Sequence, residues 1–141
     1  MKHLFPLLEA RFNGDKQLKK VARNIYRGFE GQPLRSHAPY VEISTSGVEN
    51  SDTFDAHIDI YTLDFTAFTK GGEPDRIDDI LFELRRVFKD AGSMASSEFT
   101  VVGFEMTGQV GPSLNEGFFK ATVTYQAYIH WTKKRPATEA A

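Results

Sequence analysis

The stretch GFFKATVTYQAYIHWT, residues 117–132, decides the fold because it alternates strictly between two kinds of side chain. Strict period-two alternation over so many residues predicts a long β-strand with one face on a core and the other toward water or a partner. The continuously apolar set comprises Phe119, Ala121, Val123, Tyr125, Ala127, Ile129 and Trp131. The mixed set comprises Phe118, Lys120, Thr122, Thr124, Gln126, Tyr128 and His130.

The rest of the chain supplies neighbours for this strand. Residues 40–45, 53–63 and 98–107 are rich in β-branched and aromatic residues and predict three more strands. A short polar turn between the first two favours an antiparallel hairpin. In the strand at 53–63 we expect one face on the core, comprising Phe54, Ala56, Ile58 and Ile60. The opposite face then comprises Asp55, His57, Asp59 and Tyr61.

Helical periodicity is clearest over residues 75–91, where apolar residues recur at three- and four-residue spacing and acids precede cations. Residues 3–12 predict a first helix. Residues 15–27 predict a second one, with Asp15 as its N-cap. This second run carries five cations, Lys16, Lys19, Lys20, Arg23 and Arg27. They form either a solvated helix face or a docking surface for an acidic partner or a DNA backbone.

Three glycine- or proline-containing stretches, at 28–39, 64–72 and 108–117, predict loops that extend onto neighbours. The predicted fold is α+β: a two-layer sandwich of a mainly antiparallel four-stranded sheet with helices packed on one face. The predicted order is helix, strand, strand, helix, strand, strand. Residues 1–132 form a single domain in this interpretation, and residues 133–141 form a disordered polar tail.

Composition narrows the functional classes. The chain has 141 residues, a net charge of −2 and no cysteine. This charge argues against general electrostatic binding of nucleic acid, and the absence of cysteine removes thiolate metal sites and cysteine nucleophiles. No apolar run approaches the length of about 20 residues that a membrane-spanning helix needs, and we expect a cytoplasmic protein without membrane contact.

Few residues suggest chemistry. Asp55, His57 and Asp59 alternate on one predicted strand near Asp52, which raises the possibility of a divalent cation site. Residues two apart on a strand stand about 7 Å apart, so this set is better explained as a polar or inter-subunit face. No nucleophile or phosphate-binding motif occurs in the sequence. We therefore assign no catalytic, metal or cofactor residue and predict that the protein is not an enzyme.

The whole pattern resembles the small tail completion proteins of long-tailed phages, also called tail terminator or head–tail joining proteins. The likeness covers roughly residues 4–132. It rests on the early apolar helix, the strand APYVEIS, the strand FDAHIDIYTL, the helix DRIDDILFELRRVF, and the final pair FTVVGFEMTG and FKATVTYQAYIHW. These are patterns of residue type and order rather than invariant catalytic residues.

The resemblance implies a structural role. Such proteins are ring-forming subunits, commonly hexameric, that cap the head-proximal end of the tail tube and stop its growth. They bind the tail tube protein and a head-completion or neck protein, and DNA passes through the ring without specific binding. The implied location is the host cytoplasm during assembly and then the virion tail. The alternatives are a small-molecule-binding or enzymatic α+β domain, or another neck or minor tail component.

A ring requires that one patch of a subunit meets a different patch on its neighbour. The candidates for this contact are the outward faces of the strands at 54–63 and 117–132, together with an edge strand and the protruding loops. The predicted interface residues are Tyr61, Phe118, Lys120, Gln126, Tyr128 and His130.

Overall fold

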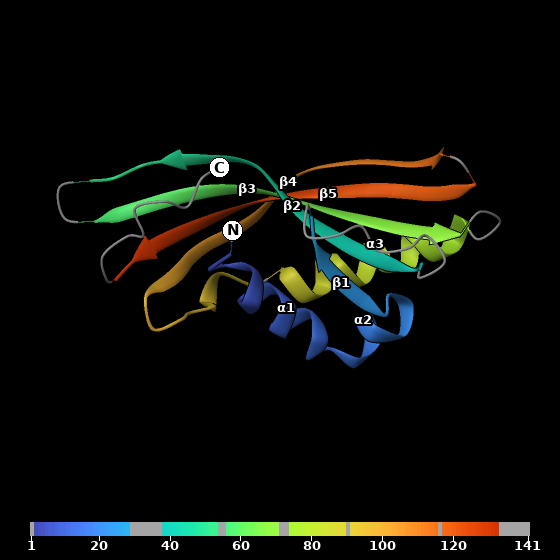
Figure 1. The fold of residues 1–141 in the computed structure, drawn as a ribbon, viewed down its shortest axis with the longest axis horizontal. Coiled ribbons are helices and arrows are strands. Elements are labelled where there is room, and N and C mark those ends of the chain that lie inside the picture. Colours follow the sequence, from blue (N-terminus) through green and yellow to red (C-terminus); the bar gives the residue numbers. More distant parts are fainter. Residues whose placement is uncertain are drawn as a thin grey trace.

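The computed structural model describes residues 2–28, 38–53, 56–70, 74–89, 91–115 and 117–132. In chain order the elements are α1 (Phe5–Asn13), α2 (Lys16–Val21), β1 (Asn24–Arg27), β2 (Tyr40–Asn50), β3 (His57–Lys70), α3 (Pro74–Phe88), the short 3-10 helix η2 (Ala91–Ser93), β4 (Phe99–Asn115) and β5 (Phe118–Trp131). Figure 1 shows the long strands above and the three α-helices gathered beneath them. The helices therefore lie on one side of a single sheet.

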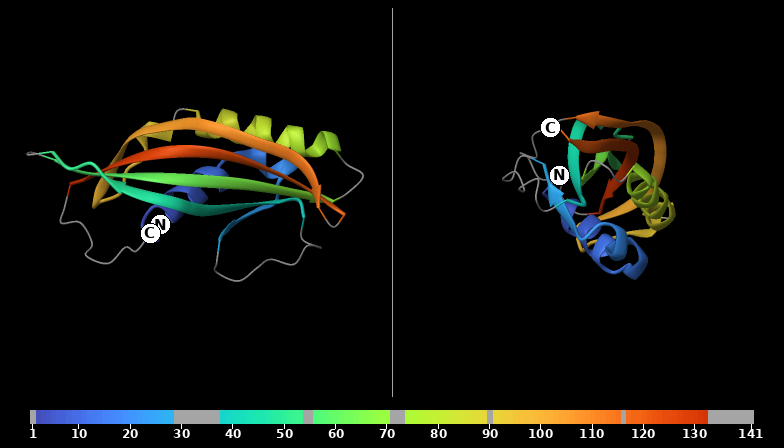
Figure 2. Two further views of the ribbon diagram at one scale, coloured as in Figure 1. Left: turned by 90° about the horizontal axis from the view of Figure 1, so that it is seen from above. Right: turned by 90° about the vertical axis from the view of Figure 1, so that its right-hand side faces the viewer.

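The sheet has five strands in the order β1-β2-β3-β5-β4. β1 runs parallel to β2, and every other neighbouring pair is antiparallel. The strand that opened the sequence analysis, β5, lies between β3 and β4, so both of its edges are hydrogen-bonded. Figure 2 shows how far β3, β4 and β5 extend along the long axis of the molecule. β4 and the β1–β2 side form the two edges of the sheet.

The predicted fold class was wrong in two respects. The sheet is mixed and five-stranded rather than mainly antiparallel and four-stranded, and two short helices and a strand precede the first hairpin. The cause lies in residues 15–27, for which the sequence predicts one helix. Asp15 does cap α2, accepting a hydrogen bond from the Leu18 amide at 3.0 Å, but α2 ends at Val21. Ala22 is already extended, and β1 begins two residues later along the edge of β2.

Two of the predicted loops are strands. β3 continues to Lys70, through most of the stretch 64–72, and β4 continues to Asn115, through most of 108–117. β4 accommodates its glycines and Pro112 through three register shifts against β5, so that bulges replace the expected loop. The predicted loop at 28–39 lies largely outside the described residues, as does the tail at 133–141.

The core lies between the helices and the inner face of the sheet. Seven β5 residues are predicted to face it, and all except the half-buried Phe119 are buried. α3 packs on β3 and β5 with its predicted apolar stripe, namely Ile77, Ile80, Leu81, Leu84, Val87 and Phe88. The ring of Phe65 on β3 meets the rings of Phe88 and Tyr125 edge-on, at centroid distances of 4.9 Å and 5.3 Å.

The predicted facing of β3 was wrong by one residue. Asp59 and Tyr61 are expected to point away from the core, yet both are buried, while Ile58 and Ile60 are half-buried on the outer face. The second half of the strand explains this reversal. Leu63, Phe65 and Ala67 are all fully buried there, and because side chains alternate they also fix the facing of the first half.

Candidate functional site

The outer face of the sheet is the first candidate site. No described helix lies on it, since α1, α2 and α3 all pack on the opposite face (Figure 1). Along β5 every second side chain points to this outer face, and these side chains are half-buried or exposed. Its centre is held by polar contacts between β3 and β5: the Thr66 and Thr122 hydroxyls lie 3.1 Å apart, and Thr124 donates to Asp64 at 2.7 Å. The result is a polar surface with aromatic residues at intervals.

Tyr128 forms the best-defined cluster on this face. Its hydroxyl donates to Glu105 on β4 at 2.9 Å and lies 3.3 Å from the Gln126 side-chain oxygen. The hydrogen bond to Glu105 is the main reason that the pKa of Tyr128 is raised above its usual value. Gly103 is the β4 partner of Tyr128, and a Cβ there would lie 2.9 Å from the ring. The absence of a side chain at Gly103 therefore lets the tyrosine ring lie across the neighbouring strand.

The predicted interface residues on β5 fall into two groups. Gln126, Tyr128 and His130 lie together near the middle and C-terminal end of the strand, beside β4 residues on one side and β3 residues on the other. Phe118 and Lys120 lie toward the opposite end, where they pair with Lys70 and Phe68 of β3. Twelve residues of strand span about 40 Å, so the two ends of this set cannot contact the same side chain of a partner.

Tyr61 does not belong to this face. Its side chain is 2% exposed and lies in the core, because the facing of β3 is the reverse of the predicted one. The other predicted interface residues do lie on the outer face: Phe118, Lys120, Gln126, Tyr128 and His130.

Sequence reasoning missed an aromatic cluster near the Phe118 end. Tyr26 of β1 meets Tyr40 of β2 edge-on at 5.5 Å between centroids, and Tyr40 stacks on Phe68 of β3 at 5.0 Å. The sequence could not place Tyr26 there because its segment predicts a helix, and it could not place Phe68 because that segment predicts a loop. The strand-like character of Ile25 and Tyr26 was the available signal.

β4 presents a second kind of exposed surface. Four apolar side chains along this edge strand are exposed: Val102, Met106, Val110 and Leu114. Val110 and Leu114 are 74% and 63% exposed, in the half of the strand nearest the β4–β5 turn. A long edge strand with exposed apolar residues is a typical docking site for another chain.

The residues considered as metal ligands are not brought together. Asp59 is buried and accepts a hydrogen bond from the Trp131 indole at 2.8 Å, whereas His57 is exposed with its Nδ1 atom 3.2 Å from Asp52. Asp55 lies outside the described residues. Within the described part of the chain, no group of three or more possible ligands gathers in a metal-binding arrangement.

The five cations of residues 15–27 do not share one helix face, because the helix ends before Arg23 and Arg27. Lys19 lies near the end of α2, where its ammonium donates to Asn13 and to the Arg23 carbonyl oxygen. The structure therefore divides this run between a helix and a strand.

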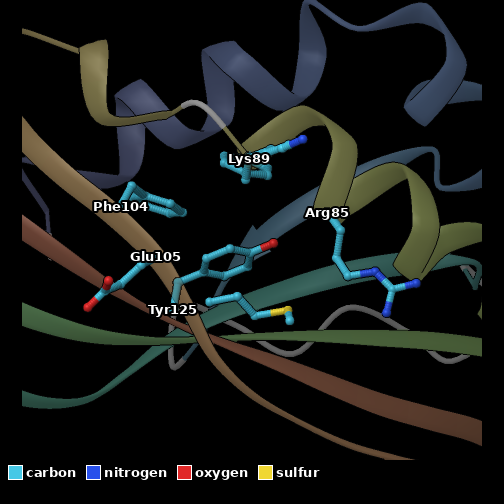
Figure 3. A pocket seen from close by; sticks show the side chains of 7 residues that line it. Arg85, Lys89, Phe104, Glu105 and Tyr125 are labelled. Carbon is cyan, nitrogen blue, oxygen red and sulfur yellow. The ribbon is translucent and has the colours of Figure 1, made fainter.

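An open pocket of about 330 Å³ lies between the C-terminal half of α3 and strands β4 and β5. Its lining comprises Arg85, Phe88, Lys89, Phe104, Glu105, Met106 and Tyr125. Figure 3 shows the Tyr125 hydroxyl pointing toward α3, between the positions of Lys89 and Arg85. The pocket exists because α3 packs on β3 and β5, which leaves the inner face of the edge strand β4 partly open.

The Tyr125 side chain is 2% exposed, and its hydroxyl has no hydrogen-bond partner among the described residues. Burial raises the pKa of Tyr125 to about 12, and the nearby Arg85 partly opposes this effect. The hydroxyl is therefore a neutral hydrogen-bond donor at physiological pH. The charged residues of the lining are Arg85, Lys89 and Glu105, and the carboxylate of Glu105 already accepts a hydrogen bond from Tyr128. An apolar pocket with a buried donor and two cations near its rim is suited to a small ligand with an anionic end.

Comparison with known proteins supports the fold. No protein-family model matches the chain, and no curated protein matches it in sequence. Among solved structures, a chain from the virion of a native gene transfer agent particle is similar, with a TM-score of 0.71 and 12% identity over 85% of this chain and 89% of that one. Another solved structure has a TM-score of 0.53 and 13% identity over 93% of this chain and 97% of the other.

At this level of identity the shared property is the fold. The structure is a five-stranded mixed sheet with helices on one face, and this fold is also found in a chain of the gene transfer agent virion. Within the described residues, none of the helices has the length and apolar character needed to cross a membrane.

Proposed function

We propose that this chain is a structural component of a phage or phage-like virion, and more specifically a tail terminator. In this role it forms a ring, commonly of six subunits, at the head-proximal end of the tail tube and joins the tube to the head. Its partners are further copies of itself, the tail tube protein and a head-completion or neck protein, with DNA passing through the ring. It acts by assembly and not by catalysis, first in the host cytoplasm and then in the tail.

The observation that carries this proposal is a sheet face that no described helix covers, bordered by an apolar edge strand, on a fold shared with a virion chain. A ring contact joins two different patches of the same protein. The Tyr128 cluster on the outer face and the exposed Val110 and Leu114 further along β4 are two such patches. The chain's small net charge of −2 also suits a lumen through which DNA must slide without being held.

The experiment that tests the proposal is tail-tube assembly with the cognate tube protein, observed by negative-stain electron microscopy. With this protein present, tubes should stop at a defined length and carry a ring at one end. Tubes that grow equally long with and without the protein would refute the capping role.

The interface is tested by Tyr128→Lys. A lysine can still pair with Glu105, whereas Tyr128→Glu would set two carboxylates against each other and disturb β4 locally. We expect Tyr128→Lys to keep the wild-type circular dichroism spectrum and to lose capping. Gln17→Lys, at an exposed position on α2 on the helical side, is the matched control and should cap normally.

The pocket beside Tyr125 favours a second candidate function, the binding of a small molecule with an apolar body and a carboxylate. Titration with a medium-chain fatty acid and its neutral amide, followed by NMR, tests this candidate. Saturable shifts at Tyr125 and Met106 with the acid alone would support it, and no shift with either compound would dismiss it.

A further inference from the structure

The outward face of α3 has a charge pattern that is complementary to itself when reversed. Phe82 lies close to the centre of this face and is 60% exposed, an unusual state for a phenylalanine. Asp75 lies seven residues before it and Lys89 seven residues after it. Seven residues are almost two helical turns, so these three side chains lie along one stripe about 10 Å apart at each step.

A second acid and a second cation also flank Phe82 at equal distances, one helical turn closer to it. Asp79 lies three residues before Phe82, and Arg85 lies three residues after it, at the edge of this face, where it also donates to Gln109 of β4 at 2.7 Å. If two α3 helices lie antiparallel with their Phe82 side chains in contact, each acid of one helix faces a cation of the other. A parallel alignment in the same register would instead place like charges together, so the pattern favours a twofold arrangement.

The charges at the ends of the stripe are available for such a contact. Among the described residues, neither Asp75 nor Lys89 forms an ion pair or side-chain hydrogen bond, and both side chains are exposed. Arg86, by contrast, is held within the subunit by Asp15 and Glu83. Figure 2 shows α3 at the periphery, with no other described element beyond its outward side.

We propose that α3 is a self-association surface, on which a second copy of this chain docks antiparallel about a twofold axis at Phe82. The contact lies on the side of the molecule opposite the outer sheet face, so it goes beyond the proposed ring contact and does not use its residues. A contact between two short helices is smaller than a standard protein interface, so the association is weak and depends on salt.

Disulfide trapping tests the position of the axis, because the chain contains no cysteine. Phe82→Cys places one thiol on the proposed axis, where two copies meet. Under mild oxidation at low salt we expect this variant to form a disulfide-linked dimer about tenfold faster than Gln17→Cys, a control at an exposed position on α2. Equal rates for the two variants would overturn the proposed axis.

Charge exchange tests the pairing. Asp75→Lys and Lys89→Glu should each weaken dimerisation at least about tenfold in sedimentation velocity, since each variant opposes like charges at both ends of the contact. An equimolar mixture should recover dimers to within about threefold of wild type, because opposite charges then face each other at both ends. A wild type that stays free of twofold dimers up to about 1 mM at low salt, or a mixture that stays as weak as its components, would overturn the proposal.

These results are separable from those for the ring. Tyr128→Lys should leave the disulfide and charge-exchange results unchanged, and Asp75→Lys should still cap tail tubes. A wild-type protein that dimerises through α3 but does not cap tail tubes would count against the tail terminator role alone, and a wild-type protein that caps tubes but forms no α3 dimer would count against the α3 contact alone.

Discussion

At the scale of single residues, the pair Asp59 and Trp131 shows how a polar group can be mistaken for a surface residue. The sequence predicts that Asp59 faces outward, yet it is buried in the core and accepts the indole hydrogen bond at 2.8 Å. The sequence could not reveal this partnership, because the two residues are 72 positions apart. What places them together is the register between β3 and β5, in which His57 pairs with Trp131 and Asp59 with Ile129.

We expect Asp59→Ala to destabilise the protein by about 2 kcal/mol, since the buried indole N–H loses its acceptor. Asp59→Asn keeps a carbonyl oxygen in place and should cost clearly less. Urea denaturation followed by fluorescence measures both changes, and the single tryptophan of the chain reports directly on this site. If the two variants lose the same free energy of unfolding, the stabilisation at this site comes from the carboxylate charge and not from the hydrogen bond.

The unpaired hydroxyl of Tyr125 leads to a second prediction. Tyr125→Phe keeps the ring in contact with Phe65 and removes a buried donor that lacks a partner among the described residues, so stability at pH 7 should rise by about 1 kcal/mol. The pKa of Tyr125 is about 12 in the folded state, against an ordinary value of 10.0 for a tyrosine. The proton is therefore held more tightly in the folded chain, and the associated stability is present below pH 10 and is lost as pH rises toward 12.

The predicted loss of stability at alkaline pH is measured by comparing Tyr125→Phe with wild type. Thermal unfolding between about pH 9 and pH 12 should show wild type losing about 2 kcal/mol more than Tyr125→Phe over this interval. Parallel losses in the two proteins would mean that the hydroxyl is solvated in the folded state.

At the scale of elements, a long amphipathic helix or strand can be predicted from the sequence, because its hydrophobic period recurs many times. A short segment cannot be predicted in this way. The sequence predicts β5 and α3 with their buried faces, because each has a dozen or more residues that agree on one period. β1 has four residues and lies against β2 only through a non-local parallel pairing, so no local pattern distinguishes it from the end of a helix. The facing of β3 is mispredicted because isoleucines occupy the outer face in the early part of the strand.

The start of α2 gives a prediction at this scale. Asp15 caps the helix through the Leu18 amide and also accepts from Arg86 of α3 at 2.7 Å; the bond from Arg86 is the larger cause of the lowered pKa of the Asp15 carboxyl. Asp15→Ala should cost about 1 kcal/mol at pH 7. Because the folded-state pKa is depressed, the benefit of Asp15 is present above the usual value of 3.8 and is lost as pH falls below it.

Chemical denaturation at pH 7 and at about pH 2.5 measures this effect. The difference in the free energy of unfolding between wild type and Asp15→Ala should be smaller at the lower pH. Asp15→Asn should be more stable than Asp15→Ala at pH 7, because asparagine also caps helices. A gap that stays constant across this range would contradict the assigned cause.

At the scale of the whole molecule, the sequence indicates that β5 has one uncovered face but cannot show what surrounds it. The extent of the outer surface depends on β3 and β4 running much further than their sequence patterns suggest, since the glycines and Pro112 of β4 are residues typical of a strand end. Bulges between β4 and β5 let this strand continue, and they are set by pairing rather than by local sequence. The long β4–β5 hairpin is therefore a product of tertiary structure.

The edge strand β4 has one part that packs in the core and another part that is exposed, and this division can be tested. On β4 the core ends near Phe104, which stacks on Phe88, while Val110 and Leu114 further along are mostly exposed. Phe104→Ala should therefore cost about 3 kcal/mol or more in urea denaturation. The double change Val110→Thr and Leu114→Gln removes little buried area and should alter monomer stability by no more than about 0.5 kcal/mol.

If the exposed part of β4 around Val110 and Leu114 docks on a neighbouring subunit in the proposed tail terminator ring, the double variant should remain folded and still fail to cap tail tubes. Its matched control is Lys20→Gln on the exposed side of α2, which should cap normally. A double variant that caps as well as wild type would remove β4 from the ring contact and leave the outer face around Tyr128 as the remaining candidate. A double variant that unfolds would instead show that the hairpin is held by contacts within the subunit.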